Sequence, residues 1–215
     1  MVRLLQGERL RLRKMTLADT EKIISWRNQS FVRKNFIYQK SFTVEGHQRW
    51  VHDMIETGKA VQFIMVRTDN DRDIGSVYFR DIDNVHHKAE YGMFIGDKSS
   101  LRKGYGTEAC KMACRYGFAN HGWHKTFSRF IATNIPSIRS CQKAGFLMEA
   151  FLKDDVFIGE KYCDIVLMAI LNPYEDALAG MYAQKGVVPP PGRWCTNGSW
   201  GHRFSVDDKE MRWAA

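Results

Sequence analysis

The chain has 215 residues, of which 44% are hydrophobic and 13% aromatic, so one domain can bury a sizeable core, and the composition argues against disorder over most of the chain. Its 32 lysines and arginines against 24 acidic residues give a formal net charge of +8, which favours acidic partners such as nucleotides, phosphorylated cofactors, nucleic acid or anionic lipid without choosing among them. The five cysteines include no CxxC pair, and no histidine pair at ligand spacing joins them, which argues against a disulfide framework and a metal site.

The first half of the chain alternates short strands with two helices. RLRLRK (9–14) alternates charge and leucine and predicts a half-buried strand. Thr16 and Asp19 form a capping-box pattern that opens a helix, and Thr43 caps a second helix over 44–57. The nearly continuous apolar run VQFIMV (61–66) predicts a central strand.

The second half predicts three more strands, two helices and a final strand. The strands are IGSVYFRDI (74–82), KAEYGMFIG (88–96) and TFSRFIAT (126–133), and the final strand lies within 156–170 with a turn at Gly159. The helices run from Gly104 to about His121 and over about 135–144. Because the alternation is not strict, we expect a mixed α/β (α+β) fold with a mostly antiparallel sheet flanked by about four helices.

The composition of the sequence changes after Asn172-Pro173. GVVPPPGRW (186–194) is typical of a linker, and the last twenty residues hold three tryptophans without clear periodicity. We therefore expect a domain over 1–171 and an appendage over 172–215. The N-terminal segment lacks the apolar core of a secretory signal, and no apolar run approaches the roughly 20 residues that span a bilayer, so we expect a cytoplasmic protein without a membrane partner.

LRKGYGTEA (101–109) is a glycine-rich turn that leaves a predicted strand and opens a helix. Such a turn exposes backbone N–H groups at the positive end of the helix dipole, where they bind phosphate. Gly104 and Gly106 allow close approach, Arg102 and Lys103 add charge, and Thr107 offers a hydroxyl. The GxG spacing by itself is also compatible with an ordinary tight turn, and neither a Rossmann fingerprint nor a Walker A loop is present.

A second segment, NIPSIRSCQKAGF (134–146), follows the next strand. Together with the turn and the order of elements, it resembles the GNAT superfamily of acyl-CoA-dependent N-acetyltransferases over roughly 7–170. The later family motif is matched by six residues: Asn134, Ser137, Ile138, Lys143, Gly145 and Phe146. RLRLRKMTLAD and the closing strand with Tyr162, Asp164 and Met168 are similar to the branch that contains ribosomal-protein N-terminal acetyltransferases and nucleotide-amino-sugar N-acetyltransferases.

The resemblance implies acetyl-CoA as co-substrate, held where strands 88–96 and 126–133 splay apart. The implied cofactor-binding residues are Met93, Phe94, Ile95, Leu101, Arg102, Lys103, Gly104, Tyr105, Gly106, Thr107, Asn134, Ser137 and Lys143. The chain departs from the family pattern twice. Leu101 replaces the usual Gln or Arg of the turn, and Cys141 stands where many members have the Tyr that protonates the departing thiolate.

Acetyl transfer to an amine needs a proton acceptor, a donor to the thioester oxygen and an acid for the leaving thiolate. The resemblance indicates Glu90 as base, with a surface carboxylate as the alternative, and Asp81 and Asp83 as weaker candidates. The Met93 or Phe94 N–H would polarise the carbonyl. Cys141, or Ser140 through water, would supply the acid, unless Cys141 only packs under the cofactor.

The acceptor site is expected from the two N-terminal helices, their connection and the neighbouring strands. The candidate substrate-binding residues are aromatic, basic or polar: Trp26, Arg27, Asn28, Arg33, Phe36, Tyr38, His47, Tyr78 and Arg80. The pattern resembles enzymes that act on nucleotide-linked amino sugars. The alternative for Trp50 is a position in the core, and the alternative for His47 is a bridge between helices.

Three acceptors therefore compete: a nucleotide-linked amino sugar, a protein N-terminal amine, and a small amine such as a polyamine or aminoglycoside. A catalytically degenerate domain that only binds acyl-CoA is a further alternative. Because the cations are dispersed among carboxylates, a nucleic-acid partner is not expected. By analogy with this fold, edge strands would pair between subunits in a homodimer.

Overall fold

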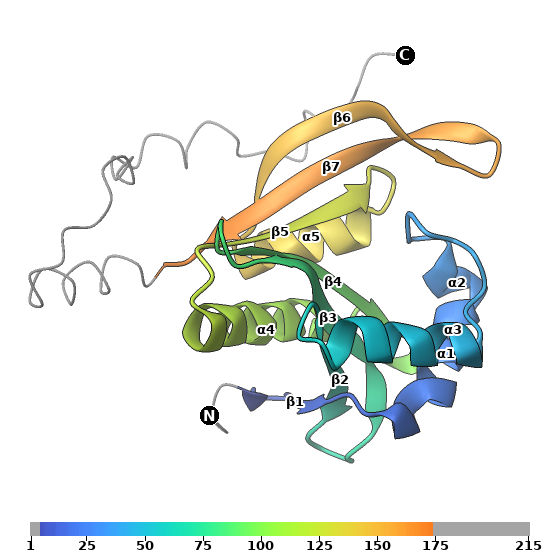
Figure 1. Ribbon diagram of the computed structural model, residues 1–215, viewed down its shortest axis with the longest axis vertical. Coiled ribbons are helices and arrows are strands. Elements are labelled where there is room, and N and C mark those ends of the chain that lie inside the picture. Colours follow the sequence, from blue (N-terminus) through green and yellow to red (C-terminus); the bar gives the residue numbers. More distant parts are fainter. Residues whose placement is uncertain (1–4, 174–215) are drawn as a thin grey trace, which may run out of the picture. The chain divides into compact units, whose positions relative to one another are not determined.

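The computed structural model describes residues 5–173 and forms one seven-stranded sheet in the order β1-β2-β3-β4-β5-β7-β6 (Figure 1). All neighbouring strands run antiparallel except β4 and β5, which run parallel. The expectation of a mixed, mostly antiparallel sheet is confirmed. The linker and the tryptophan-containing segment expected after residue 173 lie outside the described residues.

The strands are β1 Leu10–Lys14, β2 Val61–Arg67, β3 Asp73–Asp83, β4 Lys88–Ile95, β5 Lys125–Ile131, β6 Leu147–Ile158 and β7 Lys161–Leu171. The α-helices are α1 Thr20–Asn28, α2 Ser30–Arg33, α3 Val44–Trp50, α4 Tyr105–His121 and α5 Ile135–Ala144. A π-helical turn, Val51–Ile55, continues α3 and completes the helix expected over 44–57. Among the described residues, no helix is long and apolar enough to cross a membrane.

Local signals set the starts of the N-terminal helices. The capping box of Thr16 and Asp19 forms as expected, around a 3-10 turn that leads into α1. Thr43 accepts a hydrogen bond from the N–H of Gly46 and caps α3. These caps satisfy backbone donors that the first helical turn leaves unpaired, so both helices begin where the sequence indicates.

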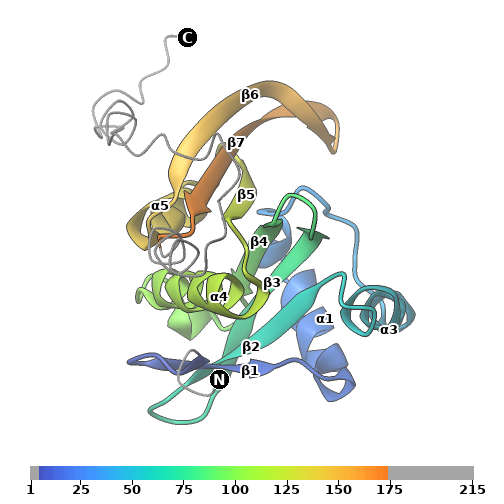
Figure 2. The same cartoon turned by 60° about the vertical axis from the view of Figure 1, so that its left-hand side comes forward.

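Strand β2 has an unbroken apolar run from Phe63 to Val66, and both of its faces are covered. Phe63 and Met65 belong to a core cluster with α4, whereas Ile64 and Val66 belong to a second cluster with α1, α2 and α3. Figure 2 shows α4 and α5 on one side of the central strands and α1 and α3 on the other. The continuous apolar run therefore indicated a strand between two helical layers.

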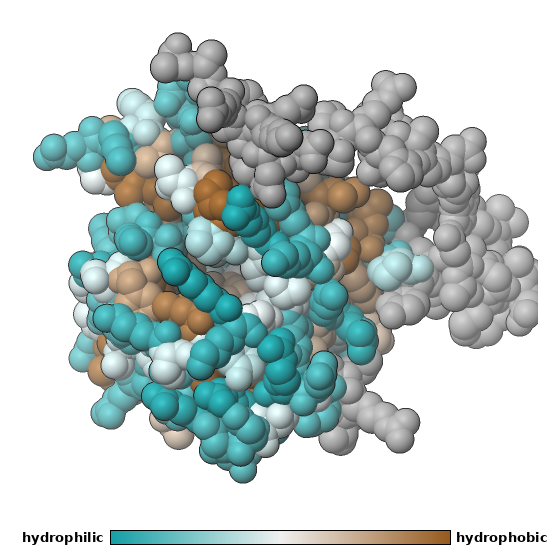
Figure 3. All heavy atoms as spheres, turned by 180° about the vertical axis from the view of Figure 1, so that it is seen from behind, coloured by the Kyte–Doolittle hydropathy of each residue, from teal (hydrophilic) through white to brown (hydrophobic). Residues whose placement is uncertain are grey.

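The C-terminal hairpin differs from the expectation. A single strand within 156–170 was expected, but β6 already begins at Leu147 and pairs with β7 along most of its length. β6 is an edge strand whose residues alternate between half-buried and exposed and include three charged residues in a row, so its sequence carries a weak strand signal. Figure 3 shows brown apolar patches on an otherwise mainly teal surface. The exposed large apolar side chains of this hairpin are Leu147, Phe151, Phe157, Tyr162 and Leu171.

Candidate active site

The sheet opens between β4 and β5. The parallel pairing covers only three residue pairs and ends at Glu90 and Phe127, although β4 continues to Ile95 and β5 to Ile131. Beyond Glu90 the backbone of β4 faces no neighbouring strand on this side, so its polar groups can pair with an extended ligand. Met93, Phe94 and Ile95 lie on this open part of the strand.

The turn at 101–106 reaches the same opening. Gly104 adopts a left-handed conformation with φ of +84° and directly precedes α4, whose N-terminus no side chain caps. A Cβ atom on Gly106 would lie 3.2 Å from Cε of Met93 and 3.0 Å from Oγ of Ser140. Leu101, Arg102 and Lys103 are exposed beside it. Free N–H groups, a helix N-terminus and two exposed cations fit a diphosphate.

Arg9 and the first residue of β1 hold the turn and the start of α4 in place. The Arg9 guanidinium donates to the Lys103 carbonyl oxygen at 2.8 Å and to the Glu108 carboxylate at 3.0 Å. The same carboxylate accepts the backbone N–H groups of Arg9 and Leu10. Glu108 thus fixes the first turn of α4 to the edge of the sheet.

Helix α5 contributes polar groups on the other side of the turn. The Ser140 hydroxyl lies 3.1 Å from the Thr107 hydroxyl, so a hydrogen bond joins α5 to the first turn of α4. Asn134 forms the N-cap of α5 without bonding its side chain to the helix, which leaves the amide available. Ser137 is half-buried and Lys143 is exposed.

Cys141 faces the core. It is buried, and its Sγ lies 3.9 Å from Sγ of Cys110 on α4. The interaction with Cys110, together with burial, raises the pKa of the Cys141 thiol well above its ordinary value. The group therefore stays a neutral thiol at neutral pH.

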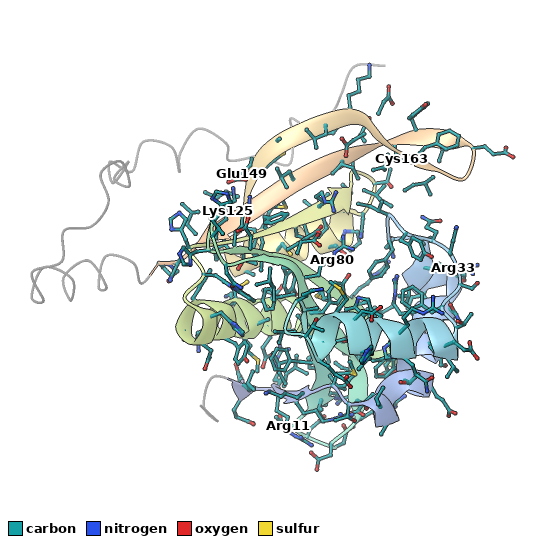
Figure 4. All side chains as sticks on the ribbon, viewed as in Figure 1. Arg11, Arg33, Arg80, Lys125, Glu149 and Cys163 are labelled. Carbon is teal, nitrogen blue, oxygen red and sulfur yellow. The ribbon has the colours of Figure 1, made fainter. Side chains whose placement is uncertain are left out.

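Glu90 lies at the point where β4 and β5 separate. Its carboxylate is buried and accepts hydrogen bonds from Arg80 on β3 at 3.0 Å and from Arg129 on β5 at 3.1 and 3.2 Å. Figure 4 shows Arg80 near the middle of the molecule and Arg33 nearer its edge, beside α2. Glu90 is thus a buried ion-paired residue, not a surface carboxylate.

Burial by itself would raise the pKa of Glu90, but the hydrogen bond from Arg129 and the charge of Arg80 outweigh it and hold the pKa below 4.5. Asp81 behaves in the opposite way. Partial burial and a hydrogen bond with Glu90 raise the pKa of Asp81 above 3.8. Of these two neighbouring carboxyls, Asp81 is thus the weaker acid.

The residues from α1 surround the open end of β4. The Trp26 ring packs onto Gly96 and meets Phe94 edge to face. Arg27 is buried, with its guanidinium carbon 3.3 Å from the centre of the Phe36 ring. The Asn28 amide donates to and accepts from the backbone of Phe42, so it holds the connection before α3 in place.

The other predicted acceptor residues are more spread out. Arg33 donates to Ser41 and Tyr38 is exposed. His47 is buried and bonds Thr20 at 3.1 Å, so it bridges α3 to α1, and burial lowers its pKa. The Tyr78 ring lies across Gly92, where a Cβ atom would come within 2.3 Å of Cζ. Arg27, Tyr78, Arg80 and Glu90 are thus close together, whereas Tyr38 and His47 stand apart.

Three residues of the site were not predicted from the sequence. The sequence predicts a strand at Arg9, a helix at Glu108 and a strand at Arg129, but no role for these residues in the site. Each contacts a partner that is distant in the sequence: Arg9 and Glu108 are 99 residues apart, and Arg129 and Glu90 are 39 residues apart. The single charged residue within the strand TFSRFIAT is the one signal that could have indicated Arg129.

A family model described as "Acetyltransferase (GNAT) domain" matches residues 9–147. The chain belongs to the GNAT acetyltransferase family. The match covers the turn, the open strand β4 and helix α5, which are the parts that carry the site. Among curated relatives, a probable N-acetyltransferase, YjcK of Bacillus subtilis, is 27% identical over 80% of this chain and 99% of its own length.

A spermidine N(1)-acetyltransferase of Escherichia coli is 27% identical over 67% of this chain and 69% of its own length. Among solved structures, the spermidine N-acetyltransferase of Vibrio cholerae in complex with CoA and spermine superposes with a TM-score of 0.71 at 21% identity, covering 77% of this chain and 96% of that one. A GNAT acetyltransferase of Bacillus anthracis gives a TM-score of 0.67 at 26% identity, covering 78% and 97%. The expected GNAT fold and acetyl-CoA-dependent N-acetyltransferase class are thereby confirmed.

Proposed function

We propose that this GNAT enzyme moves an acetyl group from acetyl-CoA to the primary amine of a small molecule, by direct attack with both substrates bound. The observation that carries the proposal is the early end of the β4–β5 pairing beside the uncapped N-terminus of α4. An open strand edge suits the amide groups of pantetheine, and the turn suits the diphosphate. No covalent acyl-enzyme is needed, because holding the amine and the thioester together already accelerates the reaction strongly.

The turn Leu101–Thr107 would bind the diphosphate, with Arg102 and Lys103 adding charge. Asn134 and Ser137 would contact pantetheine from α5, and Lys143 would lie further out. The N–H of Met93 or Phe94 would donate to the thioester oxygen as negative charge develops there. These roles rest on the placement of the residues around the opening.

The proton steps are assigned to Glu90 and Ser140. The neutral amine attacks the carbonyl carbon, its proton passes through water to the Glu90 carboxylate, and the carbon–sulfur bond breaks. The thiolate then takes a proton through the Ser140 hydroxyl or a water bound to it. Ser140 is favoured over Cys141 as this donor because Cys141 is buried against Cys110.

The small-molecule acceptor is supported by the relatives, several of which are named spermidine acetyltransferases. A nucleotide-linked amino sugar is the second candidate, favoured by the guanidinium groups of Arg27 and Arg80 and by the aromatic ring of Phe36. The branch of ribosomal-protein N-terminal acetyltransferases remains a prediction of the sequence.

Calorimetry with acetyl-CoA, followed by release of free CoA thiol with a panel of amines, tests the proposal. The panel holds spermidine, aminoglycosides, nucleotide-linked amino sugars and N-terminal peptides. Binding together with thiol release for one class supports the enzyme and identifies its acceptor. Acetyl-CoA binding without release for any amine contradicts the proposed function, and absence of binding contradicts the assignment of the turn.

A further inference from the structure

Arg27 is a charged residue inside an apolar cluster. Only 6% of it is exposed, although it lies on the short surface helix α1. Its guanidinium carbon lies 3.3 Å from the ring centre of Phe36, 4.5 Å from that of Phe42 and 5.6 Å from that of Phe94. Aromatic faces stabilise a cation, but they do not accept the directed hydrogen bonds of a guanidinium.

The guanidinium has no acidic partner within residues 5–173. Its Nη1 atom is buried without a hydrogen-bond partner, and no carboxylate acts on its charge. Burial lowers the pKa of Arg27 to about 10, so the side chain remains a cation at neutral pH. Buried charges are normally paired because an unpaired one is strongly destabilising, so this arginine is a donor without its acceptor.

Other arginines of the described residues show the contrast. Seven arginines pair with carboxylates within the described part of the chain: Arg9, Arg11, Arg13, Arg67, Arg72, Arg80 and Arg129. All seven are more exposed than Arg27. Among residues 5–173 the most buried arginine thus has no carboxylate partner, whereas seven more exposed arginines have one, the reverse of what structural ion pairing predicts.

The position of Arg27 links it to the transfer site. It packs on Phe94 of the open strand and lies near Tyr78 and Arg80, whose positive charge lowers the pKa of Arg27 further. Arg80 and Arg129 share the carboxylate of Glu90, and Arg80 also lies 3.8 Å from the carboxylate of Asp81. Together with Arg27, three guanidinium groups are thus grouped with two carboxylates, which leaves an excess of positive charge.

We propose that the acceptor amine carries an oxyanion, a carboxylate or a phosphate, and that Arg27 binds this group. The inference deepens the proposed function and rests on it. A bidentate oxyanion would take the hydrogen bonds that the aromatic rings cannot, and its charge would compensate that of Arg27 and Arg80. A polyamine brings two or more positive charges to the same place and is disfavoured.

Matched pairs of amines test the proposal directly. Ornithine and putrescine differ by a carboxylate, glucosamine 6-phosphate and glucosamine by a phosphate, and a UDP-linked amino sugar and its free sugar by a uridine diphosphate. The measurement is acetyl-CoA-dependent release of CoA thiol. In at least one pair the anionic member should have a kcat/KM higher by about tenfold or more, the size of one charge-assisted hydrogen bond. The pair that responds distinguishes carboxylate from phosphate.

Two variants assign the effect to Arg27. Arg27→Met should remove the preference, so that the ratio within the responding pair falls to about one. Arg49→Met, which removes an exposed arginine from α3, should leave the ratio unchanged. Because Arg27→Met removes an unpaired buried charge, the Tm should stay the same or rise, whereas a purely structural arginine would lower it. Arg27→Lys keeps the charge and should retain part of the preference.

Equal kcat/KM within every pair, or a preference for the uncharged members, would overturn the inference and leave the proposed function standing. A preference that persists in Arg27→Met would do the same. No thiol release with any amine would overturn the proposed function, and the inference with it.

Discussion

The Sγ atoms of Cys110 and Cys141 lie 3.9 Å apart in the core between α4 and α5. Both residues are buried, and the aromatic ring of Tyr91 on β4 belongs to the same cluster. Cys141 occupies the motif position where many family members carry a tyrosine that acts as an acid. In this chain the side chain at that position packs helix against helix.

Cys141→Ala should therefore change stability more than chemistry. Removing a small buried side chain should cost about 1 kcal/mol of unfolding free energy, whereas kcat should stay close to that of the wild type. Urea unfolding and CoA-thiol release measure the two effects. Ser140→Ala is the comparison, because loss of the hydroxyl next to Thr107 should lower kcat. A large fall in kcat for Cys141→Ala would restore the thiol as the acid.

Gly104 and Gly122 flank α4 and both have positive φ angles, +84° and +63°. An alanine at either position would be strained by about 1 kcal/mol or more, so the two variants should lose similar stability. Only Gly104→Ala should weaken acetyl-CoA binding, because its Cβ would enter the phosphate-binding turn, 3.2 Å from the Arg9 guanidinium. Calorimetric titration of acetyl-CoA into both variants checks this. Equal affinities would show that the turn does not hold the diphosphate.

The parts of the site that lie on contiguous segments could be predicted from the sequence. The turn at 101–107, the capping box at Thr16 and the helix after Asn134 form as expected. Each depends on residues within a few positions of one another, and such patterns are set by backbone geometry.

The groupings that join distant segments could not be predicted. Arg80 and Arg129 meet at Glu90 only because β3 and β5 lie on either side of β4. The rings around Arg27 come from the connection before α3 and from β4. The sequence predicted Arg27 as one of nine acceptor-binding candidates, but it did not show that Arg27 is buried or that it lacks a carboxylate partner.

Arg13 joins β1 to the start of α1 and to β3. Its guanidinium donates to Asp19 at 2.6 and 2.8 Å and to Asp73 at 2.7 Å. Burial by itself would raise the pKa of Asp19, but the hydrogen bonds from Arg13 and from the N–H of Thr16 outweigh it and hold the pKa below 3.8. Since the folded-state pKa is depressed, the ion pair contributes stability above pH 3.8, and this contribution is lost as the pH falls through the folded-state value.

Arg13→Met should accordingly destabilise the protein at neutral pH by about 3 kcal/mol, because it leaves the buried Asp19 carboxylate unpaired. The pKa of Asp19 should rise, and the acid-unfolding midpoint should move to higher pH. Arg11→Met is the control, since Arg11 pairs only with the exposed Asp71. Thermal unfolding from pH 3 to pH 8 measures both variants. Parallel stability curves for wild type and Arg13→Met would contradict the assignment.

Glu90→Gln tests the proton acceptor. The amide keeps the size of the side chain but removes the charge that Arg80 and Arg129 share, and it cannot take the proton of the amine. We expect kcat to fall about 100-fold, the scale of general-base catalysis, while the affinity for acetyl-CoA stays unchanged. Because the pKa of Glu90 is held below 4.5, wild-type activity should not decline through Glu90 until the pH falls below that value.

The matched control is Glu149→Gln, because Glu149 forms an ion pair with Lys125 at 2.6 Å, away from the opening (Figure 4). This variant should keep the wild-type kcat. If Glu90→Gln retained both kcat and the pH–rate profile, Glu90 would hold the two arginines only. The proton of the amine would then leave by another route, with Asp81 the nearest carboxyl whose raised pKa suits that task.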